Sequence, residues 1–146
     1  MEVDVLIIGQ GIAGTWLSYF LEQEGYSYAV IDQSKTDSPS RVAAGILNPV
    51  TGRRLVKTWN IDRVLPMAVE AYQTLGKLLQ IDAIHQRNIL DFFTTTQMRE
   101  AFEKRHEEDA TYVAFPVNES AWQDIFHYEY GAGIIHPCYY VDLEAI

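Results

Sequence analysis

Cysteine is nearly absent from this sequence, and its scarcity excludes one class of fold. Cys138 is the single cysteine among 146 residues, so no internal disulfide can form. Small secreted domains that depend on a disulfide framework are therefore excluded, and a reducing compartment is the expected environment.

Basic residues and long apolar runs are also scarce. Eleven Lys and Arg stand against twenty Asp and Glu, giving a formal net charge of -9. Such a charge repels nucleic-acid phosphates and anionic lipid surfaces. No apolar run approaches the roughly 20 residues that a membrane-spanning helix needs, and the first strand-like run begins at Val3, without room for a secretory signal before it. We therefore expect a cytoplasmic protein with neither a nucleic-acid nor a membrane partner.

One local concentration of positive charge interrupts this acidic composition, at Arg53, Arg54 and Lys57. These residues can steer an anionic substrate, support the phosphates of a cofactor, or form a solvated basic turn, and we favour the turn. A metal site is not expected, because His127, His136 and Cys138 lack a recognised ligand spacing.

Apolar residues make up 48% of the chain, enough for a folded core, and their spacing changes along the first 32 residues. The run from Val3 to Ile8 is rich in β-branched residues, as in a strand buried on both faces. From Ile12 the apolar residues follow a helical period that ends at Gly25, and residues 28–31 form a second strand-like run. This order predicts a βαβ unit with parallel strands.

The turn between the first strand and the helix carries the dinucleotide-binding pattern G-x-G-x-x-G. Gly9 allows a tight turn, Gly11 allows a close approach of the pyrophosphate, and Gly14 allows the helix to pack closely on the strand. The helix N-terminus offers free N–H groups to the phosphates. Asp32, at the end of the second strand, can accept hydrogen bonds from a ribose diol, and its charge disfavours NADP. The sequence predicts a dinucleotide site but leaves FAD and NAD open.

Beyond this unit the pattern is less regular. Residues 33–59 resemble an extended ordered loop with one helical turn, and residues 64–79 an amphipathic helix in which Pro66 belongs to the first turn. We further expect a helix at 96–108, capped by Thr95 or Thr96. Strands are expected at 89–94, 111–115, 125–130 and 134–140. Residues 141–144 resemble the start of another helix, so we expect the chain to be the N-terminal part of a longer protein.

The segment from Ser40 to Pro49 adds a family resemblance. Its sequence S-R-V-A-A-G-I-L-N-P resembles the flavin-contacting segment of the glycine oxidase and D-amino-acid oxidase family of FAD-dependent amine oxidoreductases. The later Gly131-Ala132-Gly133 and Val141-Asp142 resemble that family's return from the substrate domain to the cofactor domain. Two departures are an Asp at position 32, where many members carry Glu, and the absence of the family's C-terminal half.

The resemblance implies an α/β fold: a Rossmann-type FAD-binding portion at 1–60 completed by residues beyond 146, a mixed α+β substrate-domain portion at 61–140, and the start of the return at 141–146. The expected FAD-binding residues are Gly9, Gly11, Ile12, Ala13, Gly14, Asp32, Gln33, Arg41, Ala43, Ala44, Gly45 and Ile46. Small residues at 43–45 permit close approach to a flat ring.

The function implied is oxidation of the C–N bond of an amino acid or other small amine by hydride transfer to flavin, with no catalytic residue assigned. An NAD-dependent dehydrogenase and a truncated or non-catalytic dinucleotide-binding module are the alternatives. The sequence leaves the substrate, the electron acceptor and the oligomeric state undetermined.

Overall fold

The computed structural model describes residues 2–35, 38–52, 54–118, 120–143 and 145–146. Two compact units divide the chain, Met1–Ala44 and Gly45–Ile146. We call them unit 1 and unit 2 and describe each by itself. The described helices include none that is both long enough and apolar enough to cross a membrane.

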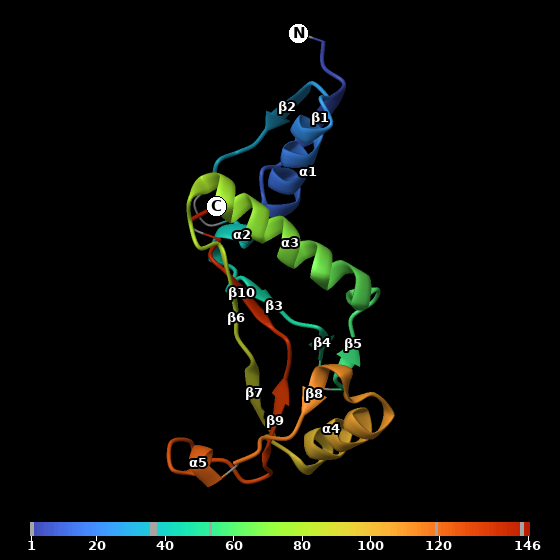
Figure 1. Cartoon of the computed structure of the whole chain (residues 1–146), viewed down its shortest axis with the longest axis vertical. Helices are drawn as coiled ribbons and strands as arrows, with labels where there is room; N and C mark the ends of the chain where they lie inside the picture. Colours follow the sequence, from blue (N-terminus) through green and yellow to red (C-terminus); the bar gives the residue numbers. More distant parts are fainter. Residues whose placement is uncertain (1, 36–37, 53, 119, 144) are drawn as a thin grey trace. The chain divides into compact units, whose positions relative to one another are not determined.

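Unit 1 is the predicted βαβ unit (Figure 1). Its elements are β1 (Val5–Ile8), α1 (Ile12–Gln23), β2 (Tyr28–Ile31) and the single turn α2 (Pro39–Val42). β1 and β2 pair in parallel, with Ile7 opposite Val30. α1 ends before Gly25, whose φ of +78° suits the glycine predicted to stop this helix. The prediction of a dinucleotide-binding type of α/β unit is thus confirmed.

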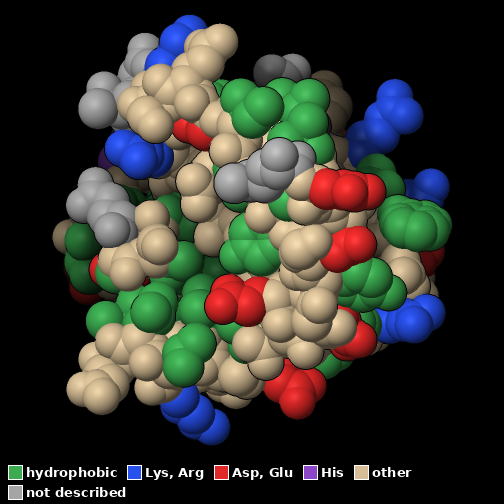
Figure 2. All heavy atoms as spheres, turned by 90° about the horizontal axis from the view of Figure 1, so that it is seen from above, with side chains coloured by type: hydrophobic (Ala, Val, Ile, Leu, Met, Phe, Trp, Pro, Cys, Tyr) green, Lys and Arg blue, Asp and Glu red, His purple; other side chains and the backbone are tan. Residues whose placement is uncertain are grey.

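Among the described residues of unit 1, side chains cover one face of the β1–β2 sheet and leave the other exposed. Ile7 points toward α1 and is 5% exposed, whereas Leu6, Ile8 and Ile31 are 54%, 81% and 59% exposed. Hydrophobic side chains also reach the surface in Figure 2, where they lie among acidic and basic ones. A strand that is apolar at successive positions is typical of a sheet covered on both faces.

Unit 2 is built from three small antiparallel sheets and two long helices. The sheets have the orders β3-β10-β6, β4-β5 and β7-β9-β8. The strands are β3 (Ile46–Leu47), β4 (Val50–Thr51), β5 (Val56–Lys57), β6 (Ile84–Gln86), β7 (Ile89–Phe92), β8 (Val113–Ala114), β9 (Ala132–Ile135) and β10 (Tyr139–Val141). The helical elements are α3 (Ile61–Leu79), α4 (Thr96–Glu108), the 3-10 turn η1 (Ala110–Tyr112) and α5 (Ser120–Gln123).

The core of unit 2 gathers side chains from both long helices and the sheets. Its largest fully buried side chain is Phe102 of α4. The buried cluster consists of Val50, Leu55, Ile61, Leu65, Phe93, Phe102, Tyr112, Val113, Ile135 and Cys138. Thr95 caps α4 as predicted, because its hydroxyl accepts a 3.2 Å hydrogen bond from the Met98 N–H.

Several sequence-based expectations for unit 2 were wrong. Residues 125–130 form no strand; Phe126 and Tyr128 instead pack their rings on Phe92, at centroid distances of 5.0 and 4.7 Å. The strand expected at 134–140 is two strands, β9 and β10, separated by a cis His136–Pro137 peptide bond. The strand expected at 111–115 is the turn η1 followed by the two-residue β8.

Two further expectations need correction. Helix α3 begins at Ile61, so Pro66 lies in its second turn, where it removes a hydrogen bond to the Asp62 carbonyl. The loop at 33–59 contains the expected helical turn, α2, but also the strands β3, β4 and β5. These strands have two residues each, too few to establish an alternating pattern. In the helix start expected at 141–144, Val141 instead ends β10, and Glu144 lies outside the described residues.

Candidate cofactor-binding site

The glycine turn of unit 1 is formed by backbone geometry that side chains would prevent. Gly9 has a φ of +95°, a conformation that residues with a Cβ rarely adopt. A Cβ at Gly14 would overlap the Gly9 carbonyl oxygen and would lie 3.3 Å from Ile7 Cγ2. The predicted tight turn and the close packing of helix on strand are therefore confirmed.

The N-terminus of α1 presents backbone donors at this turn. The Ile12 N–H donates a 2.9 Å hydrogen bond to the Ser40 hydroxyl. Among the described residues, the N–H groups of Ala13 and Gly14 have no acceptor, as expected for the first turn of a helix. No acidic side chain occupies this turn. Free donors and the positive end of the helix dipole together favour an anion such as a diphosphate.

Asp32 is held in place by the turn itself. Its Oδ2 accepts a 2.7 Å hydrogen bond from the Gln10 N–H, and its Oδ1 accepts one of 2.5 Å from the Ser34 N–H. These two bonds, with a smaller contribution from the charge of Arg41, lower the pKa of the Asp32 carboxyl below its ordinary value. Each carboxylate oxygen can accept more than one hydrogen bond, so an ionised Asp32 can still receive a ribose hydroxyl.

Two cavities of unit 1 meet at Gly9. One, of about 490 Å³, is lined by Leu6, Ile7, Ile8, Gly9, Gly11, Ile12, Ala13, Gly14, Leu17 and Ser40. The other, of about 550 Å³, is lined by Ile8, Gly9, Ile31, Asp32, Gln33, Lys35, Ser38 and Pro39. The predicted residues of the glycine turn therefore line the first cavity, and Asp32 and Gln33 line the second. Gly9 lines both cavities.

Ser40 is the residue of this site that sequence reasoning missed. It stands 28 residues after Ile12, yet its hydroxyl fills the space beside Gly11, where a Cβ would lie 2.9 Å from Ser40 Oγ. Its place at the head of the family-like segment was the available signal. Arg41, Ala43 and Ala44 follow it in unit 1, and all three are exposed.

Gly45 and Ile46 belong to unit 2. Gly45 has a φ of +65°, and a Cβ there would overlap the carbonyl oxygen of Val141. Its own carbonyl accepts a 2.8 Å hydrogen bond from the Val141 N–H, while Ile46 pairs with Tyr140. The close approach of β10 therefore requires a glycine at position 45. Contact between Gly45 and a flavin stays a prediction.

The donors and the acid of unit 1 fit the ribose and diphosphate portion of a dinucleotide. Free N–H groups at a helix start, a glycine turn without room for side chains, and an ionised carboxylate at the next strand end are the groups that such a ligand requires. This geometry suits FAD and NAD equally, and a comparison with known protein families bears on the choice between them. A family model described as FAD dependent oxidoreductase matches residues 4–142.

The chain belongs to this FAD dependent oxidoreductase family.

Three solved structures share the fold of this chain at low sequence identity. Glycine oxidase from Bacillus cereus ATCC 14579 is 20% identical with a TM-score of 0.71, over 99% of this chain and 43% of its own. L-amino acid deaminase from Proteus vulgaris is 13% identical with a TM-score of 0.68, over 98% of this chain and 35% of its own. Iminodiacetate oxidase from Chelativorans sp. BNC1 is 20% identical with a TM-score of 0.58, over 96% and 41%.

One curated relative also matches in sequence. Squalene epoxidase 3 of Arabidopsis thaliana is 31% identical over 86 residues, which is 59% of this chain and 16% of that protein. The chain thus spans less than half the length of each of these relatives.

The two described residues of the predicted basic concentration, Arg54 and Lys57, lie in different surroundings. Lys57 Nζ lies 2.8 Å from Asp62 Oδ2 and 3.6 Å from Asp109 Oδ2, and it sits 5.3 Å from the centre of the Tyr112 ring. Arg54 instead lines a pocket beside α4. Arg53 lies outside the described residues.

Tyr112 completes the arrangement around Lys57. Its hydroxyl donates a 2.6 Å hydrogen bond to Asp62 Oδ1, and its side chain is buried. The hydrogen bonds from Lys57 and Tyr112 lower the pKa of Asp62, while burial and the nearby Asp62 raise the pKa of Tyr112. We call Lys57, Asp62, Asp109 and Tyr112 the Lys57 network. Because it joins β5, α3 and η1, it is positioned to stabilise unit 2.

The buried Cys138 is poorly suited to bind a metal ion. Burial raises the pKa of the Cys138 thiol to about 11, so the thiolate that binds metals is disfavoured. Within the described part of the chain, no group of three or more His, Cys, Asp and Glu side chains is arranged to hold a metal ion.

Proposed function

We propose that the protein of which this chain is part binds FAD at the α1 turn and oxidises the C–N bond of an amino acid or another small amine. The observation that carries the proposal is the cradle at the start of α1, where free N–H groups of Ala13 and Gly14 follow Gln10, whose own N–H is bonded to the ionised Asp32. Membership of the FAD dependent oxidoreductase family favours FAD over NAD at this turn.

The amine substrate is supported by the neighbours' names. Glycine oxidase, L-amino acid deaminase and iminodiacetate oxidase are named for amino-acid or amino-diacid substrates. Bound FAD supplies a two-electron acceptor for a hydride removed from the carbon next to the amine. The partner is thus a small molecule, and a cytoplasmic location remains part of the proposal.

The proposed FAD-binding residues fall into three groups by role. The turn of Gly9, Gly11 and Ile12 would receive the diphosphate, with the free N–H groups of Ala13 and Gly14 as its donors. Asp32 and Gln33 would hold the ribose, and Arg41 would offset phosphate charge. Ala43, Ala44, Gly45 and Ile46 would run beside the flavin ring. These residues bind and orient the cofactor, and none is assigned a proton transfer.

The bare face of the β1–β2 sheet supports the proposed domain division. Leu6, Ile8 and Ile31 would be covered if residues beyond 146 completed the cofactor domain begun at 1–60. Residues 61–140 would then belong to the substrate domain, and 141–146 would begin the return. The partial coverage of every solved relative is in keeping with this division.

The test starts with the protein purified from its complete reading frame. A visible flavin spectrum, with FAD released on denaturation and identified by mass, is the expected result. Anaerobic addition of glycine, L- and D-amino acids and N-substituted glycines should bleach that spectrum for at least one compound. A protein that stays colourless after incubation with FAD would overturn the cofactor proposal. A yellow protein that no amine bleaches would leave a non-catalytic module as the better reading.

A further inference from the structure

A pocket of unit 2 gathers positive charge in a chain whose formal net charge is -9. The pocket has a volume of about 450 Å³ and lies between the β4–β5 hairpin and α4. Its lining residues are Arg54, Val56, Ala101, Lys104, Arg105 and Glu108. Three of these six are cationic and one is anionic, so the pocket has a surplus of two positive charges.

Arg105 is the fixed member of this group. Its Nε donates a 3.0 Å hydrogen bond to the Leu55 carbonyl, and its side chain is 22% exposed. This bond holds the guanidinium between the hairpin and α4. Because an arginine carries five N–H donors, the anchored group keeps donors for a ligand.

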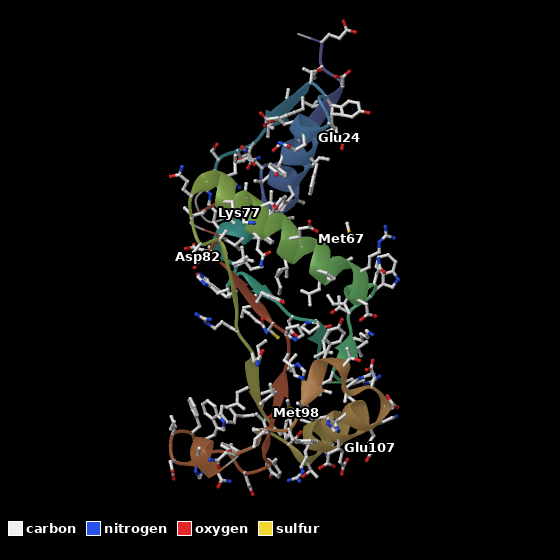
Figure 3. The ribbon with its side chains drawn as sticks, in the orientation of Figure 1. Glu24, Met67, Lys77, Asp82, Met98 and Glu107 are labelled. Carbon is white, nitrogen blue, oxygen red and sulfur yellow. The ribbon has the colours of Figure 1, made fainter. Side chains whose placement is uncertain are left out.

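Glu108 does not saturate the cations around it. Its Oε1 lies 3.7 Å from Lys104 Nζ and its Oε2 lies 3.7 Å from Arg105 Nη1, and both distances are long for a hydrogen bond. Glu108 follows Glu107, which Figure 3 labels on α4. The Arg54 side chain has neither a hydrogen bond nor an ion pair to any described residue. Two of the three cations are therefore available to a ligand without breaking a short bond.

We propose that this pocket binds the phosphate group of a small molecule. A phosphate monoester carries about -1.5 to -2 charges at neutral pH, which matches the surplus of the pocket, and guanidinium groups match its oxygens geometrically. Val56 and Ala101 provide an apolar wall on which the organic part of the ligand can rest. The proposal concerns unit 2 alone and does not depend on the cofactor or on amine oxidation.

The test is a titration of the protein from its complete reading frame with inorganic phosphate and with glycerol 3-phosphate, at constant ionic strength. We expect a dissociation constant below about 1 mM by calorimetry. The double variant Arg54→Gln/Lys104→Gln should weaken binding of both probes by about tenfold or more, because it removes two charge-assisted contacts.

The matched control is Arg63→Gln/Arg87→Gln. It removes the same two charges from exposed positions outside the pocket and should change the affinity less than about twofold. Circular dichroism should show both variants folded. Tighter binding of glycerol 3-phosphate identifies a phosphorylated metabolite as the ligand, and equal binding identifies free phosphate. Absence of binding near 1 mM, or equal loss in the two double variants, would overturn the proposal.

Discussion

The backbone N–H of Gln10 donates a 2.7 Å hydrogen bond to Oδ2 of Asp32, so the glycine turn and the end of β2 are tied together before any ligand arrives. This bond gives the acid a structural task in addition to the proposed contact with a ribose. The same carboxylate accepts the Ser34 N–H, which closes the loop after β2. Asp32 therefore fixes the conformation of the turn and also supplies a negative charge to the site.

We expect Asp32→Asn to lower thermal stability at pH 7 and to weaken FAD binding. The pKa of Asp32 is lowered in the folded state, so its stabilisation is present above the ordinary value of 3.8 and is lost as the pH falls through the folded value. The difference in melting temperature should therefore shrink in acid. Asp124→Asn, at an exposed acid, is the control. An unchanged melting temperature and FAD affinity at pH 7 would contradict the prediction.

Replacing Gly11 and replacing Gly14 with alanine should reduce FAD uptake to different extents. At Gly14 the new Cβ meets the backbone carbonyl of Gly9, which cannot turn away, so Gly14→Ala should abolish FAD uptake. At Gly11 the Cβ meets the hydroxyl of Ser40, the end of a side chain, so Gly11→Ala should be milder. Adding Ser40→Ala should restore part of the loss at Gly11 and none at Gly14. Flavin content per protein is the measurement, and equal defects would refute this ranking.

Unit 1 could be predicted from sequence because its contacts are local. The change of apolar period and the three glycines of the turn all lie within the first 31 residues, and the constraints on Gly9 and Gly14 lie inside that stretch. The Ser40 contact, which spans 28 residues, already escaped this reasoning.

Unit 2 was predicted less well because its sheets pair distant segments. Ile46 pairs with Tyr140, and β10 also pairs with β6, a three-residue strand that the sequence did not indicate. Aromatic residues at 125–130 suggested a strand because such residues are enriched in sheets. Their rings are used instead to cover Phe92, a contact that only the tertiary structure determines.

Removing the Tyr112 hydroxyl should loosen the Lys57 network. In Tyr112→Phe the 2.6 Å hydrogen bond to Asp62 is lost, while the ring and its packing remain. We expect the melting temperature to fall by about 2–4 °C, the shift typical for one hydrogen bond in a chain of this size. Tyr26→Phe, at an exposed tyrosine of unit 1, is the control. A fall of equal size in both variants would argue against a specific role for this bond.

Gly133→Ala should strain the core of unit 2. The added Cβ would overlap the ring of Phe102, which is fully buried. Overpacking of this kind costs about 1–3 kcal/mol in the free energy of unfolding. Because the two residues meet directly, the double variant Gly133→Ala/Phe102→Leu should be less destabilised than the sum of the single variants. Urea unfolding of all four proteins gives the cycle, and strict additivity would contradict the proposed overlap.

The contribution of Asp91 to stability should depend on pH in the opposite sense to that of Asp32. It lies on β7 opposite Gly133 and is half-buried. Its carboxylate has no hydrogen-bond or ion-pair partner among the described residues, and burial raises the pKa of this carboxyl above 3.8. An acid with a raised folded pKa lowers stability once the pH exceeds its ordinary value, because the unfolded state ionises more readily.

We therefore expect Asp91→Asn to increase the free energy of unfolding at pH 7. The increase should diminish as the pH falls and should vanish well below 3.8, where the aspartate is protonated in both states and resembles the amide. Urea unfolding at a series of pH values measures the difference, with Asp124→Asn as the exposed control. A variant less stable than the parent at pH 7 would mean that the charged carboxylate has a stabilising partner, and the assignment of Asp91 as an uncompensated buried acid would then be wrong.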